Sequence, residues 1–259
     1  MTTNFKAYFI QCITNLHVGS GDAGYGIIDK MVQRDPVTKY PTIHASSLKG
    51  GLRQHFEKKW GKGSEKVNKV FGTEDQNNND TGTHTFLNAD LIALPVRCTQ
   101  RQFVHSFDKK MVDFINVKTK NILGEAKNIF KLKVNDGNNL LYGAHGNEFY
   151  AEDYQLQGTP FENPFSFNQS LIESQFATFQ TSHFEDLVKN LPVLARNKVG
   201  DDKNLWYEEF VPHQTIFITF IGNNEENNEF VEALQNDLIQ IGGNASVGYG
   251  LCKFNLINF

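Results

Sequence analysis

One stretch near the start of the chain, residues 17–53, constrains it more than any other part of the sequence. It reads HVGSGDAGYGIIDKMVQRDPVTKYPTIHASSLKGGLR and contains a glycine-rich turn, a single acid at Asp29 and a helix start at Ser46 and Ser47. Glycine lets one backbone approach another closely, and a helix N-terminus offers free N–H groups to an anion. This combination of flexible backbone, isolated carboxylate and basic helix start is suited to gripping a phosphodiester chain and holding a metal beside it.

Composition narrows the class of protein. With 259 residues the chain is long enough for one large domain or two small ones. Its net charge of −4 argues against a protein that coats nucleic acid non-specifically, although a local basic groove remains compatible with it. The cysteines Cys12, Cys98 and Cys252 lie far apart, which argues against a cysteine-based zinc site or a disulfide framework.

The sequence shows no targeting or membrane signal. The N-terminus lacks a basic segment followed by a long apolar run, and no stretch approaches the about 20 apolar residues of a membrane span. We therefore expect a reduced, cytoplasmic protein with no membrane partner.

Periodicity predicts alternating strands and helices. Strands are expected over 7–16, 86–98 (interrupted near Pro95), 214–221 and 247–259. Helices are expected over 46–60, 106–118, 169–190 and 229–241. A hairpin is expected over 191–211 around Gly200-Asp201-Asp202, and a mobile loop over 61–83. Ser46 or Ser47 is expected to cap the first helix, with Leu48, Leu52 and Phe56 on its buried face. The order strand, helix, strand at both ends predicts a single α+β domain with a ferredoxin-like (RRM-like) core. That core would comprise about 5–100 and 212–259, with long insertions over about 101–211.

The glycine loop itself matches the dinucleotide fingerprint GxGxxG at residues 19–24. A dinucleotide-binding fold needs a helix directly after the glycines and an acid about 20 residues further on, and this chain shows neither. A plain strand connection, or a loop whose N–H groups lie along phosphates, fits the sequence better. A second glycine-rich run, residues 242–250, precedes the last strand, and we expect the two loops to lie near each other and line one groove.

Several segments together resemble one family. They are HVGSGDAGYGIIDKMVQRDP, YPTIHASSLKGGLR, FG with FLNADLIALPVR, LPVLAR with LWYEE, and IGGNASVGYG. The resemblance is to the RAMP superfamily of CRISPR-associated proteins, and more narrowly to the repeated backbone subunit of the type III-B (Cmr) effector complex. The matches keep the family's order over nearly the full chain and are weakest over about 101–190.

The resemblance implies a function and a set of partners. Copies of such a subunit form a filament along a CRISPR RNA with other Cmr subunits, and paired single-stranded target RNA is cleaved once per subunit with a divalent metal, Mg²⁺ or Mn²⁺. The family's catalytic and metal-binding aspartate falls on Asp29. A β-hairpin thumb wedges into the guide–target duplex, and the hairpin near 194–211 is the candidate for it.

The residues give these roles different support. Without the resemblance, Asp29 would be a surface acid paired with Lys30 or Arg34; with it, a catalytic role is expected, and His17 could contribute acid–base help. Candidate RNA contacts, which would hold the backbone without reading sequence, are Ser46, Ser47, Lys49, Arg53, Arg34, Arg196, Gly243, Asn244, Gly248, Tyr249 and Gly250. Trp206, Tyr207 and Phe210 either pack the hairpin or displace a base.

Three alternatives stay open beside a metal-dependent endoribonuclease. The chain could be a non-catalytic RNA-binding scaffold subunit with Asp29 in a structural role. It could be a CRISPR RNA-processing endonuclease of the same superfamily, which would work without metal. The GxGxxG match leaves a nucleotide-dependent oxidoreductase as the least favoured reading.

Overall fold

A computed structural model shows a mixed α+β protein, as predicted, whose residues cluster into two compact units. The first unit contains Met1–Asp90, Leu191–His213 and Phe217–Leu256, and the second contains Leu91–Asn190, Gln214–Ile216 and Ile257–Phe259. The structure describes residues 4–21, 27–73, 81–146, 148–167, 172, 175–197, 205–223 and 228–259. Within these ranges, no helix is both long and apolar enough to cross a lipid bilayer.

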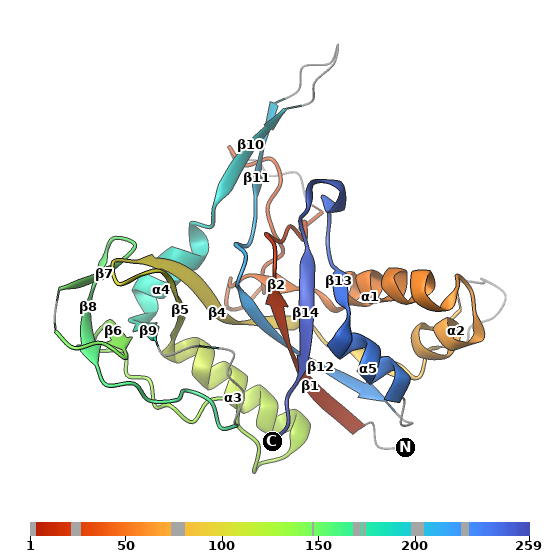
Figure 1. Cartoon of the computed structure of the whole chain (residues 1–259), viewed down its shortest axis with the longest axis horizontal. Coiled ribbons are helices and arrows are strands. Elements are labelled where there is room, and N and C mark those ends of the chain that lie inside the picture. Colours follow the sequence, from red (N-terminus) through yellow and green to blue (C-terminus); the bar gives the residue numbers. More distant parts are fainter. Residues whose placement is uncertain are drawn as a thin grey trace. The chain divides into compact units, whose positions relative to one another are not determined.

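The sheet of the first unit joins strands from both ends of the chain (Figure 1). Its order is β13 (Leu238–Gln240), β14 (Leu251–Leu256), β1 (Asn4–Cys12) and β12 (Ile216–Asn223), with β3 (His84–Phe86) paired to β12 and β2 (Thr42–Ile43) paired to Ala89 and Asp90. β1 and β14 are antiparallel, with Cys12 opposite Cys252. Four consecutive residues of β1, Ala7 to Ile10, are buried, as in a strand covered on both faces.

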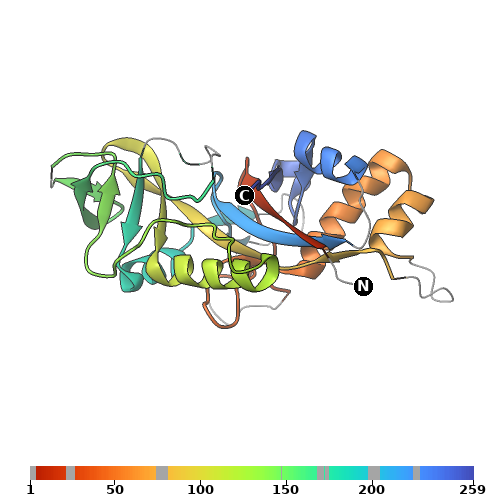
Figure 2. The same ribbon diagram turned by 90° about the horizontal axis from the view of Figure 1, so that it is seen from below.

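Three helices pack together in this unit, as both views show (Figures 1 and 2). They are α1 (Ala45–Trp60), α2 (Glu65–Phe71) and α5 (Asn228–Asn236). The predicted stripe of α1 is confirmed, because Leu48, Leu52 and Phe56 are all fully buried. The Phe56 ring lies 4.9 Å from that of Phe230 on α5 and 5.8 Å from that of Phe71 on α2. Aromatic contacts therefore hold α1 against both other helices.

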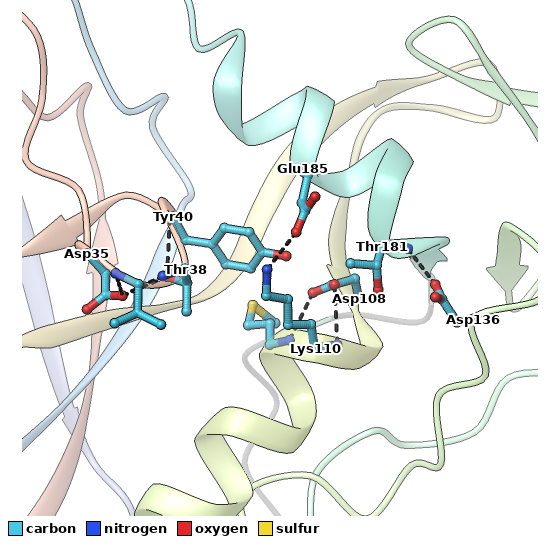
Figure 3. A network of polar contacts seen from close by, with 10 residues as sticks. Asp35, Thr38, Tyr40, Asp108, Lys110, Asp136, Thr181 and Glu185 are labelled. Carbon is cyan, nitrogen blue, oxygen red and sulfur yellow. Dashed lines mark hydrogen bonds and ion pairs between the residues drawn. The ribbon is translucent and has the colours of Figure 1, made fainter.

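The second unit is a sheet with two helices. It contains β4 (Ala89–Cys98, from Leu91 on), β5 (Arg101–Asp108), β9 (Phe176–Phe179), β6 (Leu140–Tyr142), β8 (Tyr154–Thr159), β7 (Phe149–Ala151), α3 (Lys109–Leu123) and α4 (Thr181–Lys189). Figure 3 shows Asp108 capping α3 and Lys110 paired with Glu185 on α4. The Lys110 ammonium lies 2.6 Å from the Glu185 carboxylate. Asp136 accepts a hydrogen bond from the Thr181 amide at the start of α4. These polar contacts fix both helix starts.

A two-stranded antiparallel hairpin stands apart from these sheets and consists of β10 (Val193–Asn197) and β11 (Leu205–Glu209). Leu194 pairs with Glu208, and Arg196 pairs with Trp206. The predicted hairpin is confirmed, while its predicted turn at Gly200-Asp201-Asp202 lies outside the described residues. A short 3₁₀ turn, η1 (Ala245–Val247), lies in the second glycine-rich run.

Some predicted elements are wrong in extent or type. The helix expected over 229–241 ends at Asn236, and its last part is β13, because pairing with β14 overrides the helical periodicity. The helix expected over 169–190 begins only at Thr181, since the apolar run before it is the fully buried strand β9; residues 168–171, 173 and 174 of that span lie outside the described chain.

Other boundaries also differ from the sequence prediction. The helix expected from residue 106 begins at Lys109, because Asp108 caps it, and α2 occupies part of the loop expected over 61–83. The expected break at Pro95 is absent, and β4 shifts register only between Val96 and Cys98. The last strand is shorter than predicted and covers Leu251–Leu256.

The predicted serine cap of α1 is wrong. The N-cap residue is His44, which makes no side-chain capping bond, and Ser46 and Ser47 lie inside the first turn. Distant side chains do the capping instead, because Asn88 Oδ1 accepts from the Ala45 amide at 2.8 Å and Gln33 Oε1 accepts from the His44 amide at 2.8 Å.

Adjacent glycines in α1 provide a matched test of this packing. A Cβ on Gly50 would meet nothing within 4 Å, so Gly50→Ala should stabilise the protein by roughly 0.5–1 kcal/mol through the better helix propensity of alanine. A Cβ on Gly51 would lie 2.8 Å from Ile241 Cδ1 and 3.2 Å from the Gln240 carbonyl. Gly51→Ala should therefore be at least about 1 kcal/mol less stable than Gly50→Ala in urea denaturation. Equal stabilities would contradict the packing of α1 against β13.

Burial of His84 makes the stability of the fold depend on pH. Desolvation lowers the pKa of His84 from its ordinary 6.5 to about 4, and Lys69 adds to the effect. Its Nε2 is buried without a hydrogen-bond partner among the described residues. The unfolded chain therefore takes up a proton at His84 that the folded chain excludes, and stability should fall as pH drops from 6.5 towards 4. In parallel urea titrations, His84→Gln should show a shallower decline over this window; an identical slope would contradict the prediction.

Candidate functional site

Asp29 begins a short extended run that lies beside the hairpin. The Asp29 and Lys30 amides both donate to the Tyr207 carbonyl, at 3.0 and 3.1 Å, and the Glu209 amide donates to the Lys30 carbonyl at 2.9 Å. Lys30 and Glu208 thus form a parallel bridge. We call residues 29–34 the Asp29 segment.

The carboxylate of Asp29 is held but not buried. Its Oδ2 accepts a hydrogen bond from the Tyr207 amide at 2.8 Å, and the residue is exposed. Oδ1 has no partner among the described residues, so one oxygen fixes the orientation of the side chain while the other remains available to a ligand.

The other edge of the Asp29 segment pairs with the start of the first glycine loop. The Ser20 amide donates to the Met31 carbonyl at 3.0 Å, and the Gln33 amide donates to the Val18 carbonyl at 2.8 Å. The segment is therefore a short strand between the glycine loop and β11. Residues 22–24, which complete the GxGxxG match, lie outside the described residues.

His17 is buried and bound to the same strand as Asp29. Its Nδ1 lies 2.7 Å from the Glu209 carbonyl oxygen. A carbonyl oxygen can only accept, so Nδ1 carries a proton and the neutral ring keeps its lone pair on Nε2. Nε2 faces Gly19, where an added Cβ would lie 3.2 Å away. The structure thus brings His17 and Asp29 to positions two residues apart along β11.

The two glycine-rich runs meet, which confirms their expected proximity. We call residues 242–250 the terminal glycine loop. Its Gly243 amide donates to the His17 carbonyl at 2.9 Å, and its Gly250 amide donates to the Asn15 carbonyl at 2.7 Å. The loop turns through left-handed conformations at Gly242, Asn244, Gly248 and Gly250, with φ between +61° and +81°.

Glu208, which the sequence analysis did not single out, joins this loop to the hairpin. It is 1% exposed, and its Oε1 lies 3.1 Å from Arg196 Nε and accepts from Asn244 Nδ2. The Arg196 contact is an ion pair without the alignment of a hydrogen bond. Lys30 Nζ is 3.9 Å from Oε2. The Arg196 guanidinium also stacks over the Tyr249 ring at 4.7 Å. Arg196, a predicted RNA contact, is therefore engaged within the protein.

Glu209 was also not predicted as a site residue. It is 1% exposed, with Oε1 2.5 Å from Arg34 Nη2 and Oε2 accepting from the Val32 amide at 3.0 Å. Arg34 further donates to the Lys39 carbonyl at 3.1 Å, across a turn in which Asp35 accepts from Thr38 (Figure 3). Arg34, a second predicted RNA contact, is thus occupied by a buried acid.

The first turn of α1 keeps more of its polar groups open. Ser46 is exposed and Lys49 is half-buried, while Ser47 Oγ accepts from Gln33 Nε2 at 2.9 Å. Gln33 also donates to the Gly19 carbonyl at 3.2 Å, which links the glycine loop to this helix start. Arg53 is held one turn further on by Glu57 and by the Gly72 carbonyl.

No sequence signal identified the partners of Gln33, Glu208 and Glu209. Two adjacent acids in a strand face opposite sides of it. Both Glu208 and Glu209 can therefore be buried only because each face of the strand is covered at this point. The partners of their side chains lie 11 to 178 positions away in the sequence and become visible only in the fold.

The described residues around Asp29 offer only part of a metal site. Across the part of the chain that the structure describes, no three His, Cys, Asp or Glu side chains are grouped to hold one. Asp29 offers one open carboxylate oxygen, which suits a hard divalent cation as a single ligand. The protein can therefore contribute to such a site, and other groups must complete it.

Comparison with known proteins places this geometry in a family context. A family model described as the RAMP superfamily matches residues 9–253. The CRISPR system CMR subunit Cmr4 of Saccharolobus solfataricus is 26% identical over 99% of this chain and 97% of its own length. The CRISPR system Cmr endoribonuclease Cmr4 of Pyrococcus furiosus is 24% identical over 97% and 96%.

Solved structures show the same fold. A chain of type III-B Cmr-beta bound to cognate target RNA has a TM-score of 0.79 and 25% identity, covering 97% of this chain and 96% of that one. Oligomeric Cmr4 from Pyrococcus furiosus has a TM-score of 0.72 at 18% identity, covering 99% and 100%.

The junction of the two glycine-rich runs depends on the lack of a side chain at Gly242. A Cβ there would lie 2.4 Å from the His17 carbonyl oxygen, while a Cβ on Gly248 would meet nothing within 4 Å; both residues have positive φ. Gly248→Ala should cost about 1 kcal/mol from backbone strain alone, and Gly242→Ala about 2–4 kcal/mol from strain plus overlap. Denaturant unfolding of the two variants measures the difference, and equal losses would contradict the close approach at His17.

Proposed function

The chain belongs to the RAMP superfamily, and from this membership and the geometry around Asp29 we propose that it is the repeated backbone subunit of a type III-B (Cmr) effector complex. In that complex it binds CRISPR RNA and cleaves paired single-stranded target RNA. The observation that carries the proposal is the exposed carboxylate of Asp29, fixed by the Tyr207 amide beside two glycine-rich runs.

The relatives support the partners. Both curated relatives are Cmr4 subunits that match this chain over nearly its full length, and one is named an endoribonuclease. A similar solved structure is bound to cognate target RNA, and another is an oligomer. CRISPR RNA, target RNA, copies of the chain in a filament and other Cmr subunits are therefore the proposed partners, and the bacterial or archaeal cytoplasm is the proposed location.

The fold supports the same assignment. We infer a ferredoxin-like core from the strand order β14, β1, β12, β3, with α1 and α5 as connecting helices. We assign the hairpin of β10 and β11 as the thumb, since it forms a sheet of its own and presents exposed apolar side chains at Val193, Leu205 and Tyr207. Whether the chain is a single domain, as the sequence predicts, stays a prediction.

The proposed roles follow from what each residue has available. Asp29 would contribute one ligand to Mg²⁺ or Mn²⁺, and RNA oxygens would supply the others; the bound ion would orient a 2′-hydroxyl or offset phosphoryl charge. His17 Nε2 would accept a hydrogen bond from a ribose hydroxyl.

Guide RNA would be held mainly by neutral donors. The first turn of α1, with Ser46, Ser47 and Lys49, would bind phosphate, because some of its amides and hydroxyls make no hydrogen bond within the described part of the chain. The terminal glycine loop, including Gly243, Asn244, Gly248, Tyr249 and Gly250, would let the RNA backbone approach closely. Arg34, Arg53 and Arg196 could contact phosphate only while sharing their present partners.

A non-catalytic scaffold is the second candidate, favoured by the single carboxylate at the site. A CRISPR RNA-processing endonuclease is the third, and metal independence would favour it. The three functions differ in their requirement for Asp29 and for metal, and one experiment separates them.

Asp29→Asn should abolish cleavage by the assembled complex while leaving assembly and target binding intact. Because the amide keeps its acceptor for Tyr207 but cannot serve as an anionic ligand, we expect a rate loss of at least about 100-fold. Cleavage of end-labelled target RNA measures it, and EDTA should abolish wild-type cleavage.

Asp113→Asn, which removes an exposed acid of the second unit, is the matched control and should cut at the wild-type rate. Normal cleavage by Asp29→Asn would favour the scaffold or another catalytic residue, and cleavage that survives EDTA would favour the processing endonuclease.

A further inference from the structure

Glu209 binds the Asp29 segment through both its main chain and its side chain. Its main-chain amide donates to the Lys30 carbonyl at 2.9 Å, and its main-chain carbonyl accepts from His17 Nδ1 at 2.7 Å. Its carboxylate accepts from the Val32 amide at 3.0 Å and pairs with Arg34 at 2.5 Å. One residue thus contacts the segment at three positions and His17 at a fourth. We call the carboxylate contacts of Glu209 to Val32 and Arg34 the Glu209 clamp.

The clamp is the part of this arrangement that depends on side-chain chemistry. Glu209 is 1% exposed, and the side chain of Arg34 is 17% exposed, so each charge depends on the other for compensation. Removing one partner leaves the other buried without its counter-charge. On the edge that faces β11, the main chain holds the segment only through the bonds of Tyr207 and Glu209; on the other edge, Met31 and Gln33 bond to the first glycine loop.

Register along this ladder decides where the catalytic acid points. Asp29 Oδ2 accepts from the Tyr207 amide only while Lys30 lies opposite Glu208. A shift of one residue would turn the side chain of Asp29 to the other face of the segment. The clamp binds the segment three to five residues after Asp29 and opposes such a shift.

We propose that Glu209 is a positioning residue for RNA cleavage: the Glu209 clamp holds Asp29 in register, and the main-chain carbonyl of Glu209 orients His17. The inference rests on the proposed function. It also assigns Arg34 to the clamp as the counter-charge of Glu209, in place of its predicted role as a phosphate contact.

The test uses assembled complexes carrying Glu209→Gln, Arg34→Gln or both changes. Glutamine at 209 keeps the shape of the side chain and an acceptor for the Val32 amide but loses the charge that pairs with Arg34. Each single variant should lower the single-turnover cleavage rate by about tenfold to 100-fold, as expected for a small misplacement of a catalytic group. Target RNA affinity should stay within about twofold of wild type.

The double variant supplies the decisive comparison. If Glu209 and Arg34 act as one unit, their losses do not multiply, and the double variant should cleave no more slowly than the worse single variant. If the double variant cleaved at a rate reduced by the product of the two single losses, the clamp would be overturned. It would also be overturned if Arg34→Gln lost target affinity but cleaved normally, because that result would make Arg34 a phosphate contact.

Hydrogen–deuterium exchange of the purified chain gives a readout independent of cleavage. Glu209→Gln should speed exchange in peptides covering 27–34 and 205–211 and leave the peptides of β1 and β14 unchanged. Asp237→Asn, which breaks a half-buried ion pair with His55 and Lys59, is the matched control and should change neither cleavage nor these two peptides.

Faster exchange throughout the chain in Glu209→Gln would make the residue a determinant of global stability and would overturn its positioning role. Unchanged exchange together with normal cleavage would also overturn that role. A wild-type complex that does not cleave at all would refute the proposed function instead, and the exchange result alone would then decide whether the clamp exists.

Discussion

The burial of two neighbouring carboxylates at the end of β11 organises the candidate site. Glu208 and Glu209 are each 1% exposed, and a buried charge is stable only when it is paired. Because successive residues of a strand face opposite sides, the two acids draw different segments to the hairpin. Glu208 binds Arg196 and the terminal glycine loop through Asn244, while Glu209 binds the Asp29 segment through Arg34. The position of the exposed Asp29 thus follows from the ion pairs of the buried Glu208 and Glu209.

Local patterns predicted the elements that depend on local physics. The stripe of Leu48, Leu52 and Phe56 identified α1 because a helix buries residues that recur every three to four positions, and the hairpin followed from two apolar arms around a glycine-containing turn. The prediction failed where long-range pairing decides the outcome. β13 reads as the end of a helix, yet it pairs with β14, and α1 begins without a serine cap because Gln33 and Asn88, distant in sequence, take its first amides.

The site could be predicted in part for the same reason. The resemblance predicts a catalytic role for Asp29, and this role stays a prediction. Glycine density predicted that the two loops would lie close together, and the bond from Gly243 to His17, two residues before the first loop, agrees with it. The partners of Arg34 and Arg196 could not be found from sequence, because an arginine looks the same in one dimension whether it faces solvent or a buried carboxylate. Their pairing changes the interpretation of the surface, since two of the expected phosphate contacts serve the fold first.

This allocation of charge agrees with the acidic balance of the chain. The chain has a net charge of −4, and Arg34, Arg53 and Arg196 are all in ion pairs, so these three arginines offer little uncompensated positive charge to attract a polyanion. Backbone amides, hydroxyls and glycine-lined approaches can still bind ribose and phosphate, and they do so without distinguishing bases. A subunit that must accept any guide sequence is suited to such contacts. In the proposed function, a single carboxylate would need RNA oxygens to complete a metal site, so cleavage would require the paired RNA to be in place before the ion is fully coordinated.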